Sequence, residues 1–276
     1  MGEAEGSVGE TPGPAGKIAW RTIGSGPPLL LINGYAATGA DWDPAFLEGL
    51  SATSTVILPD NRGMGGSGSD GTELSIEAMA GDAVTLLDDL EIESVDVAGW
   101  SMGGFISQVL AARAPGRVRR LVLLSTGPGG ELEVPRDPDV EQTLFDHSGT
   151  PKEQARRLLG LLFPPAMAED VIEQFGDAVA EAQSHLDHDV LASQQEAMGA
   201  WAGSGSAANE RLASITAPTL VACGGEDRVI PPGNAMVMAN HLPDSWLARF
   251  PGAGHAVMAQ EARPLCALLD TFLNRT

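Results

Sequence analysis

The feature that most constrains this chain is a Gly-x-Ser-x-Gly pattern at residues 99–103, which lies between a strand-like run and a helix-like run. A strand-like run at 95–98, with β-branched Val95 and Val97, leads into it. In this setting Ser101 sits on a sharp strand-to-helix turn, where the positions two before and two after tolerate almost no side chain. Gly99 and Gly103 meet that demand. The pattern alone is weak in a chain with 34 glycines, so a nucleophilic Ser101 needs partners elsewhere.

Strand-like and helix-like segments alternate at short spacing on both sides of this pattern. The segments expected to form strands are 17–23, 29–32, 55–58, 95–98, 118–125, 219–222 and 246–250. Segments with helical periodicity include 75–90, 102–114, 234–241 and 261–274. This alternation predicts an α/β fold with a mostly parallel sheet covered by helices on both faces, and with 17–23 as an edge strand.

The alternation breaks between residues 126 and 214, where no apolar strand run occurs. Helical segments are expected there at about 139–146, 152–163, 167–184 and 187–201. We therefore predict a helical cap at 126–214, inserted into a core formed by 17–125 and 215–276. Residues 1–16 are rich in acids, glycine and proline and lack the apolar segment of a signal peptide, so a disordered tail is expected.

Two further loops at strand ends carry the partners that a serine nucleophile needs. Asp227 follows the strand-like run at 219–222, and His255 follows the run at 246–250. A histidine can accept the serine proton near neutral pH, and a carboxylate can fix its tautomer and stabilise the imidazolium. In parallel sheets such groups gather at the carboxyl ends of the strands. Glu226 is an alternative to Asp227 as the acid.

With these motifs the chain resembles the α/β-hydrolase superfamily over about residues 17–276. The motifs are 33–35, 60–67, 99–104 and the Asp227 and His255 loops, in the order serine, acid, histidine. The resemblance implies an eight-stranded sheet and an oxyanion hole formed by the backbone N–H groups of Tyr35 and Met102. Most members have histidine where this chain has Asn33. The nearest likeness is to esterases and lactonases, including the 3-oxoadipate enol-lactonase-like group.

Several side chains around these motifs are given expected roles. Trp100 and Met258 are expected to line or back the substrate pocket. In this superfamily, Asp60 and Arg62 hold their turn together. An enol-lactonase with a carboxylate substrate would need a cation, which Arg156 or Arg157 in the cap could offer, although a helix surface is the simpler role for both.

The leading hypothesis is a serine hydrolase that cleaves carboxylic esters or lactones through an acyl-enzyme, with no cofactor or metal. Four alternatives stay open. C–C bond hydrolysis, perhydrolysis or cofactor-free haloperoxidation, and acyl transfer would use the same triad. A non-catalytic ligand receptor would keep only the fold.

Composition narrows the class of partner. The net charge of −21 disfavours nucleic acid and anionic membrane surfaces and favours a small neutral or apolar substrate. No run of 18 uncharged apolar residues occurs, so no membrane span is expected. Two cysteines are expected to be free thiols in a reducing, cytoplasmic location. His185 and His188 are spaced like metal ligands but lie among acids, which favours a solvated helix face. The oligomeric state is open.

Overall fold

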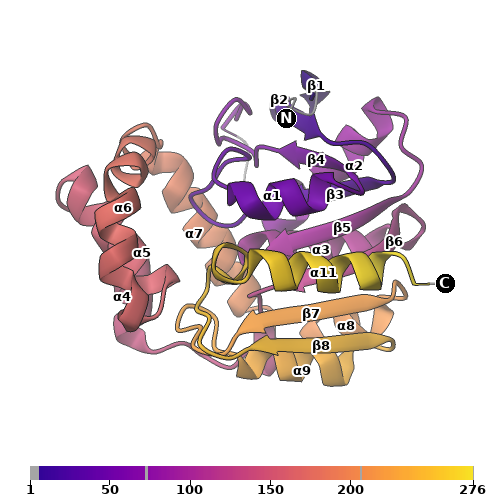
Figure 1. Cartoon of the computed structure of the whole chain (residues 1–276). Helices are drawn as coiled ribbons and strands as arrows, with labels where there is room; N and C mark the ends of the chain where they lie inside the picture. The colour runs from indigo at the N-terminus through magenta and orange to yellow at the C-terminus, as the bar shows by residue number, and fades with distance from the viewer. Residues whose placement is uncertain (1–5, 72–73, 206, 276) are drawn as a thin grey trace.

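A computed structural model describes residues 6–71, 74–205 and 207–275, and these form a twisted sheet between helices, with a separate group of helices at one end (Figure 1). The described strands make one eight-stranded sheet in the order β1-β2-β4-β3-β5-β6-β7-β8. From β4 to β8 neighbouring strands pair in parallel, whereas β1–β2 and β2–β4 are antiparallel. The strands are β1 (Val8–Gly13), β2 (Gly16–Ile23), β3 (Pro28–Ile32), β4 (Thr55–Pro59), β5 (Val95–Trp100), β6 (Val118–Leu124), β7 (Thr219–Gly224) and β8 (Ser245–Phe250). The α/β class, the eight strands and the mostly parallel pairing are as predicted.

Alternate residues of each central strand face opposite helix layers, which explains the near-continuous apolar runs of the sequence. In β3, Leu30 packs with one cluster and Leu31 with the other. The first layer holds α2 (Ile76–Asp89), α3 (Met102–Arg113), α8 (Ala207–Ser214) and α9 (Gly233–His241). The second holds α1 (Pro44–Ser51), α10 (Val257–Gln260) and α11 (Ala262–Leu273). Two short 3-10 turns, η1 (Pro115–Arg117) and η2 (Gly130–Leu132), complete the described helical elements outside the cap.

The N-terminal segment differs from the prediction. Residues 1–16 were expected to be a disordered tail, but Val8–Gly13 forms β1 and pairs with β2. Thr11 is buried, and its Oγ1 donates a hydrogen bond to Asp89 of α2, 2.7 Å away. Backbone pairing and this polar contact hold β1, so the segment needs no apolar pattern to become a strand. β1 therefore forms the sheet edge in place of 17–23, and residues 1–5 lie outside the described residues.

Four helices close to the expected positions form the cap, at the left of Figure 1. They are α4 (Pro138–Leu144), α5 (Pro151–Leu162), α6 (Pro165–Ser184) and α7 (His188–Ala202). Asp137, Thr150 and Asp187 cap the first turns of α4, α5 and α7 through their side chains. The expected end of the cap at residue 214 is too late, because α8 already packs on the core helices α3 and α9.

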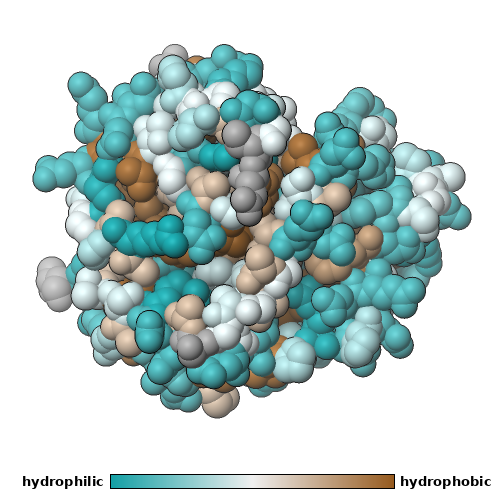
Figure 2. Space-filling view, turned by 180° about the vertical axis from the view of Figure 1, so that it is seen from behind, coloured by the Kyte–Doolittle hydropathy of each residue, from teal (hydrophilic) through white to brown (hydrophobic). Residues whose placement is uncertain are grey.

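The cap covers the edge of the sheet at which the parallel strands end. In Figure 1 the arrowheads of β7 and β8 point toward this side. Loops that follow β3, β5, β7 and β8 therefore meet beneath it. Seen from behind, the surface is mostly hydrophilic over both core and cap, with scattered apolar residues (Figure 2). No described helix has the length and hydropathy needed to cross a bilayer.

Candidate active site

Ser101 occupies a strained turn between β5 and α3. Its backbone has φ 56° and ψ −121°, in the left-handed region that non-glycine residues rarely adopt. A Cβ on Gly99 would overlap the carbonyl oxygen of Gly103, and a Cβ on Gly103 would overlap that of Ile32. At both positions the neighbouring backbone approaches too closely for any side chain, so glycine is required. The turn presents the serine hydroxyl at the carboxyl edge of the sheet, beside the first turn of α3.

The structure brings together the three side chains predicted to form a triad. Ser101 Oγ lies 3.0 Å from Nε2 of His255, and Nδ1 of His255 lies 2.8 Å from Oδ2 of Asp227. The second carboxylate oxygen of Asp227 accepts hydrogen bonds from the backbone N–H groups of Val229 and Ile230, at 2.9 and 2.8 Å. These bonds fix the carboxylate in its loop. All three side chains are buried, so the chain of hydrogen bonds is shielded from water.

Glu226, the alternative acid, is exposed to solvent next to the buried Asp227. Its backbone N–H donates to the carbonyl of Ala253, which ties the β7 loop to the β8 loop that carries His255. The burial and the hydrogen bond to His255 select Asp227 as the partner of the histidine.

Trp100 and Met258 lie beside the histidine loop. Nε1 of Trp100 donates to the backbone carbonyl of His255 at 3.0 Å, and the two rings are 5.2 Å apart. The other side of Trp100 contacts Trp42, 6.2 Å between ring centroids, within the layer of α1 and α11. Met258 is buried in the same layer. Trp100 therefore supports His255 from the core side. That Trp100 and Met258 line a substrate pocket stays a prediction.

The loop after β3 lies directly over the serine turn. A Cβ on Gly34 would be 3.2 Å from Cβ of Ser101. Asn33 closes this loop from inside, because its Oδ1 accepts from Gly34 N at 2.8 Å and its Nδ2 donates to the carbonyl of Thr38. Asn33 therefore shapes this loop at the position where most members of the superfamily have histidine.

The backbone amides of Tyr35 and Met102 are the predicted oxyanion donors. Among the residues that the structure describes, neither amide donates a hydrogen bond to another protein group. Met102 is the first residue of α3, where backbone N–H groups have no partner within the helix. Both amides are consequently free to bind an acceptor beside Ser101.

Asp60 holds the turn after β4, as the resemblance implies, and it also binds the β3 loop. The carboxylate of Asp60 accepts from the backbone N–H groups of Gly39 and Gly66, at 2.7 and 2.8 Å. Arg62 forms a two-pronged ion pair with the buried Asp82 of α2, at 2.9 and 2.8 Å. The hydrogen bonds that Arg62 donates to Asp82 raise the pKa of Arg62. These charged residues thus hold loops in place.

The cap contacts the β3 loop through groups that carry no sequence motif. The hydroxyl of Tyr35 lies 2.6 Å from Nε2 of His147, which follows α4, and the Tyr35 ring meets Phe145 edge-on at 5.5 Å. Burial raises the pKa of Tyr35 and lowers that of His147. From α7, the buried Gln194 accepts a hydrogen bond from the backbone N–H of Ala36 at 3.1 Å. Sequence reasoning missed both His147 and Gln194, since only their long-range contacts distinguish them.

The cap arginines are engaged away from the triad. Arg156 pairs with Glu169 on the cap surface, at 2.6 Å. Arg157 donates to the carbonyls of Asp146 and Ser148. Neither offers the free cation that a carboxylate substrate would require. His185 pairs with the exposed Glu181, and the described residues contain no cluster of three or more potential metal ligands.

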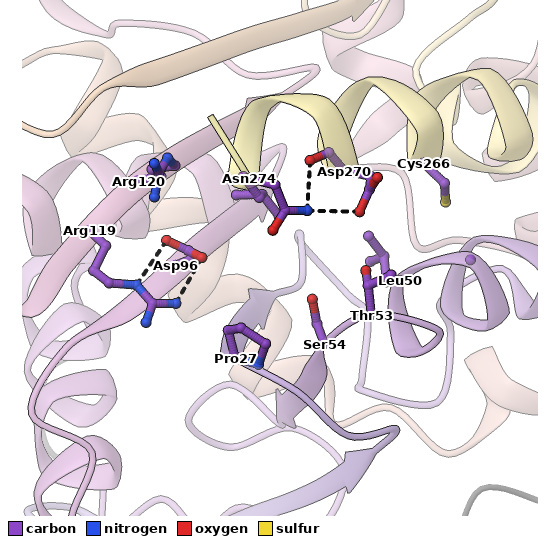
Figure 3. A pocket seen from close by; sticks show the side chains of 12 residues that line it. Pro27, Leu50, Thr53, Ser54, Asp96, Arg119, Arg120, Cys266, Asp270 and Asn274 are labelled. Atoms are coloured by element: carbon purple, nitrogen blue, oxygen red, sulfur yellow. Dashed lines mark hydrogen bonds and ion pairs between the residues drawn. The ribbon is translucent and has the colours of Figure 1, made fainter. Parts of the chain in front are cut away.

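A cavity lies at the opposite, amino end of the strands. Its volume is about 260 Å³, and Pro27, Asp96, Arg119 and Cys266 are among its lining residues (Figure 3). Arg119 pairs with Asp96 at 2.8 Å. Burial raises the pKa of the free thiols of Cys223 and Cys266 to about 11, so both are protonated near neutral pH.

Comparison with known proteins finds a matching family model, and two relatives and a solved structure that are named as hydrolases. A family model described as the alpha/beta hydrolase fold matches residues 27–262. The provisionally named carbamate hydrolase RutD of Azorhizobium caulinodans is 32% identical over 237 residues, which cover 86% of this chain and 87% of that protein. The 2-hydroxymuconate semialdehyde hydrolase of Pseudomonas sp. (strain CF600) is 28% identical and covers 91% of this chain and 88% of its own length.

A solved structure of a hydrolase from Pseudomonas aeruginosa PA01 superimposes with a TM-score of 0.83 at 26% identity. The match covers 98% of this chain and 99% of that one, so it includes both the core and the cap. The RutD relative and the semialdehyde hydrolase share the hydrolase name but are named for different substrates.

Proposed function

The chain belongs to the α/β-hydrolase fold family, and on that premise we propose that it is a serine hydrolase that cleaves small, neutral carboxylic esters or lactones. The observation that carries the proposal is the buried hydrogen-bond chain from Ser101 through His255 to Asp227. This arrangement activates a serine for attack on a carbonyl carbon, and the two unpaired amides beside it suit the charge that develops there.

In the proposed reaction His255 accepts the proton of Ser101 as the serine oxygen attacks the substrate carbonyl carbon. The backbone N–H groups of Tyr35 and Met102 stabilise the resulting oxyanion. His255 then gives its proton to the leaving alcohol oxygen, and the acyl-enzyme forms. Water, deprotonated by His255, attacks the acyl carbon and releases the acid and the free serine. Asp227 keeps Nδ1 of the histidine protonated and stabilises the imidazolium throughout.

A neutral substrate fits the charges around the site. The two cap arginines considered as partners of a carboxylate are committed to other groups, and the chain carries a net charge of −21. A negatively charged substrate would therefore find repulsion and little compensation. Esters, lactones and carbamates all offer a neutral carbonyl with an oxygen or nitrogen leaving group.

C–C bond hydrolysis is the second candidate, because one relative named for a semialdehyde hydrolase matches 91% of this chain. It would use the same triad but needs a carbon leaving group that can accept a proton. The ester proposal ranks first because it requires no group beyond those just described.

A fluorophosphonate probe tests the proposal, since it reacts with an activated serine. We expect one label per chain near neutral pH, located at Ser101 by mass spectrometry, and no label in Ser101→Ala. The exposed Ser184 provides the matched control, and Ser184→Ala should label at the wild-type rate. No labelling of the folded wild-type protein would contradict the proposal. Labelling without turnover of any ester, lactone or carbamate would favour the C–C candidate.

A further inference from the structure

Helix α7 presents one buried face to the core, and a glutamine stands in the middle of it. The buried residues of this helix are Leu191, Gln194, Ala197, Met198 and Trp201. Their spacing of three and four places them on one side of the helix. All except Gln194 are apolar, and Gln194 itself is 0% exposed. Burying an amide in an apolar stripe is costly unless its hydrogen bonds are made, so this glutamine needs an explanation.

The stripe runs across the carboxyl edge of the sheet, over the candidate active site. One turn before Gln194, Val190 packs against the β4 loop, where a Cβ on Gly63 would lie 2.9 Å from its methyl groups. Near the end of the helix Trp201 stacks on Phe105, which lies one turn into α3 from Ser101, with centroids 5.0 Å apart. Gln194 lies between these two contacts and reaches the loop over the serine turn.

One end of the Gln194 amide is fixed by the loop. Oε1 accepts the backbone N–H of Ala36, the residue next to the oxyanion donor Tyr35. Only an oxygen can accept from this N–H, so the bond determines which amide atom is which. Ala36 has φ 56°, a strained conformation that persists only where surrounding contacts enforce it.

The other end of the amide is unpaired. Within the described residues, Nε2 of Gln194 has no hydrogen-bond partner, although it is buried. Its orientation is set by the bond at Oε1, so the direction of its two hydrogens is fixed relative to the β3 loop. A buried donor without a partner destabilises the folded protein, so such a group in a native structure requires an explanation, for which a functional role is one candidate.

We propose that Gln194 is a specificity-determining residue, whose Nε2 donates a hydrogen bond to an acceptor oxygen that the substrate carries in addition to its scissile carbonyl. The inference rests on the proposed serine hydrolase function. Ser101 and the cap residue Gln194 are both buried, so the substrate enters when the cap helices separate from the β3 loop. When the cap closes, Gln194 binds the substrate through Nε2 and the Ala36 N–H through Oε1. The preferred substrate is thus an ester, lactone or carbamate with an ether, hydroxyl or second carbonyl oxygen.

Alkyl fluorophosphonates test this without requiring a turnover substrate. The series consists of a hexyl probe and analogues in which an ether oxygen replaces each chain methylene in turn. The readout is the second-order rate constant of Ser101 labelling, divided by the rate of probe hydrolysis in buffer. We expect the wild-type protein to favour one ether probe over the all-carbon probe by about tenfold, the size of one hydrogen bond.

Two variants separate the donor from the acceptor of the amide. Gln194→Met removes both, whereas Gln194→Glu retains oxygens that can accept the Ala36 N–H and removes the donor. Both should lose the preference for the ether probe. Gln195→Met is the matched control, because Gln195 is the adjacent, exposed glutamine of the same helix, and it should keep the wild-type ratio. If Gln194→Met does not fold, as judged by thermal unfolding, Gln194→Glu carries the comparison.

The outcomes distinguish this inference from the function on which it rests. No labelling of the wild-type protein by any probe rejects both. Labelling at Ser101 with no ether preference, or with a preference that survives in both Gln194 variants, rejects the role of Gln194 and leaves the serine hydrolase proposal intact. A loss of overall rate with an unchanged ratio would mean that Gln194 only holds the Ala36 loop, and this also overturns the inference.

Discussion

The core and the cap of this protein contribute to the same site through different kinds of structure. The core provides Ser101, Asp227 and His255 from loops that directly follow buried strands, and their positions are fixed by sheet geometry and required glycines. The cap contributes His147 and Gln194, from a loop and from mid-helix, through single hydrogen bonds to the β3 loop. Under the proposed function, the chemistry is carried out by residues of the core, whereas the choice of substrate depends on a few contacts between the cap and the β3 loop.

The comparison predicts its largest effect within the core triad. Asp227→Asn keeps the shape of the side chain but removes the charge and alters the tautomer of His255. We expect the labelling rate of Ser101 to fall by about 10⁴, with little loss of stability. The exposed Glu226→Gln provides the control and should label normally. If Glu226→Gln caused the loss and Asp227→Asn did not, the acid would be misassigned.

The triad could be predicted from the sequence because each member follows a recognisable strand within a few residues. Gly99 and Gly103 mark the serine turn locally, and the order serine, acid, histidine adds independent support. β1 could not be predicted in this way, since Val8–Gly13 carries one buried residue and depends on pairing with β2. The roles of His147 and Gln194 could not be predicted from the sequence either, because each depends on a contact with a residue more than 100 positions away.

The next effect concerns stability of the core loops. Arg62→Met removes one partner of a buried ion pair and leaves the Asp82 carboxylate uncompensated. We expect a loss of about 3–5 kcal/mol in the free energy of unfolding, measured by chemical denaturation. The double variant Arg62→Met/Asp82→Leu should recover much of that loss, because no lone charge remains buried. Equal losses in the single and double variants would show that packing, rather than charge burial, dominates at this turn.

Loss of the N-terminal cap of helix α5 should have a smaller effect on stability, confined to that helix. Thr150 caps α5 in a reciprocal arrangement with Glu153, in which each side chain accepts from the other residue's backbone N–H. Thr150→Ala should destabilise α5 by about 1 kcal/mol. Amide hydrogen exchange should then show about fivefold lower protection in α5, with α3 and the core strands unchanged. Equal loss of protection in the core would mean that cap and core unfold as one unit, which would contradict the difference between the two regions.

The smallest effect is a dependence on pH at the contact between cap and core. Burial lowers the pKa of His147, the neighbouring His188 lowers it further, Asp146 opposes the shift, and Arg157 adds to the lowering. The unfolded chain therefore binds the His147 proton more readily than the folded protein does. The contribution of neutral His147 to stability is present above the ordinary histidine pKa of 6.5 and is lost as the pH falls through the lower folded value.

Acidification should accordingly loosen the Tyr35–His147 contact. We expect hydrogen exchange at the Tyr35 loop and around His147 to accelerate below pH 6.5 relative to the core strands. His147→Gln keeps a hydrogen-bonding group for the Tyr35 hydroxyl but does not titrate, so this acceleration should disappear. His241→Gln, which replaces a histidine bonded within α9, should retain it. Persistence of the effect in His147→Gln would assign the pH response to another group and leave the cap attached by contacts that do not titrate.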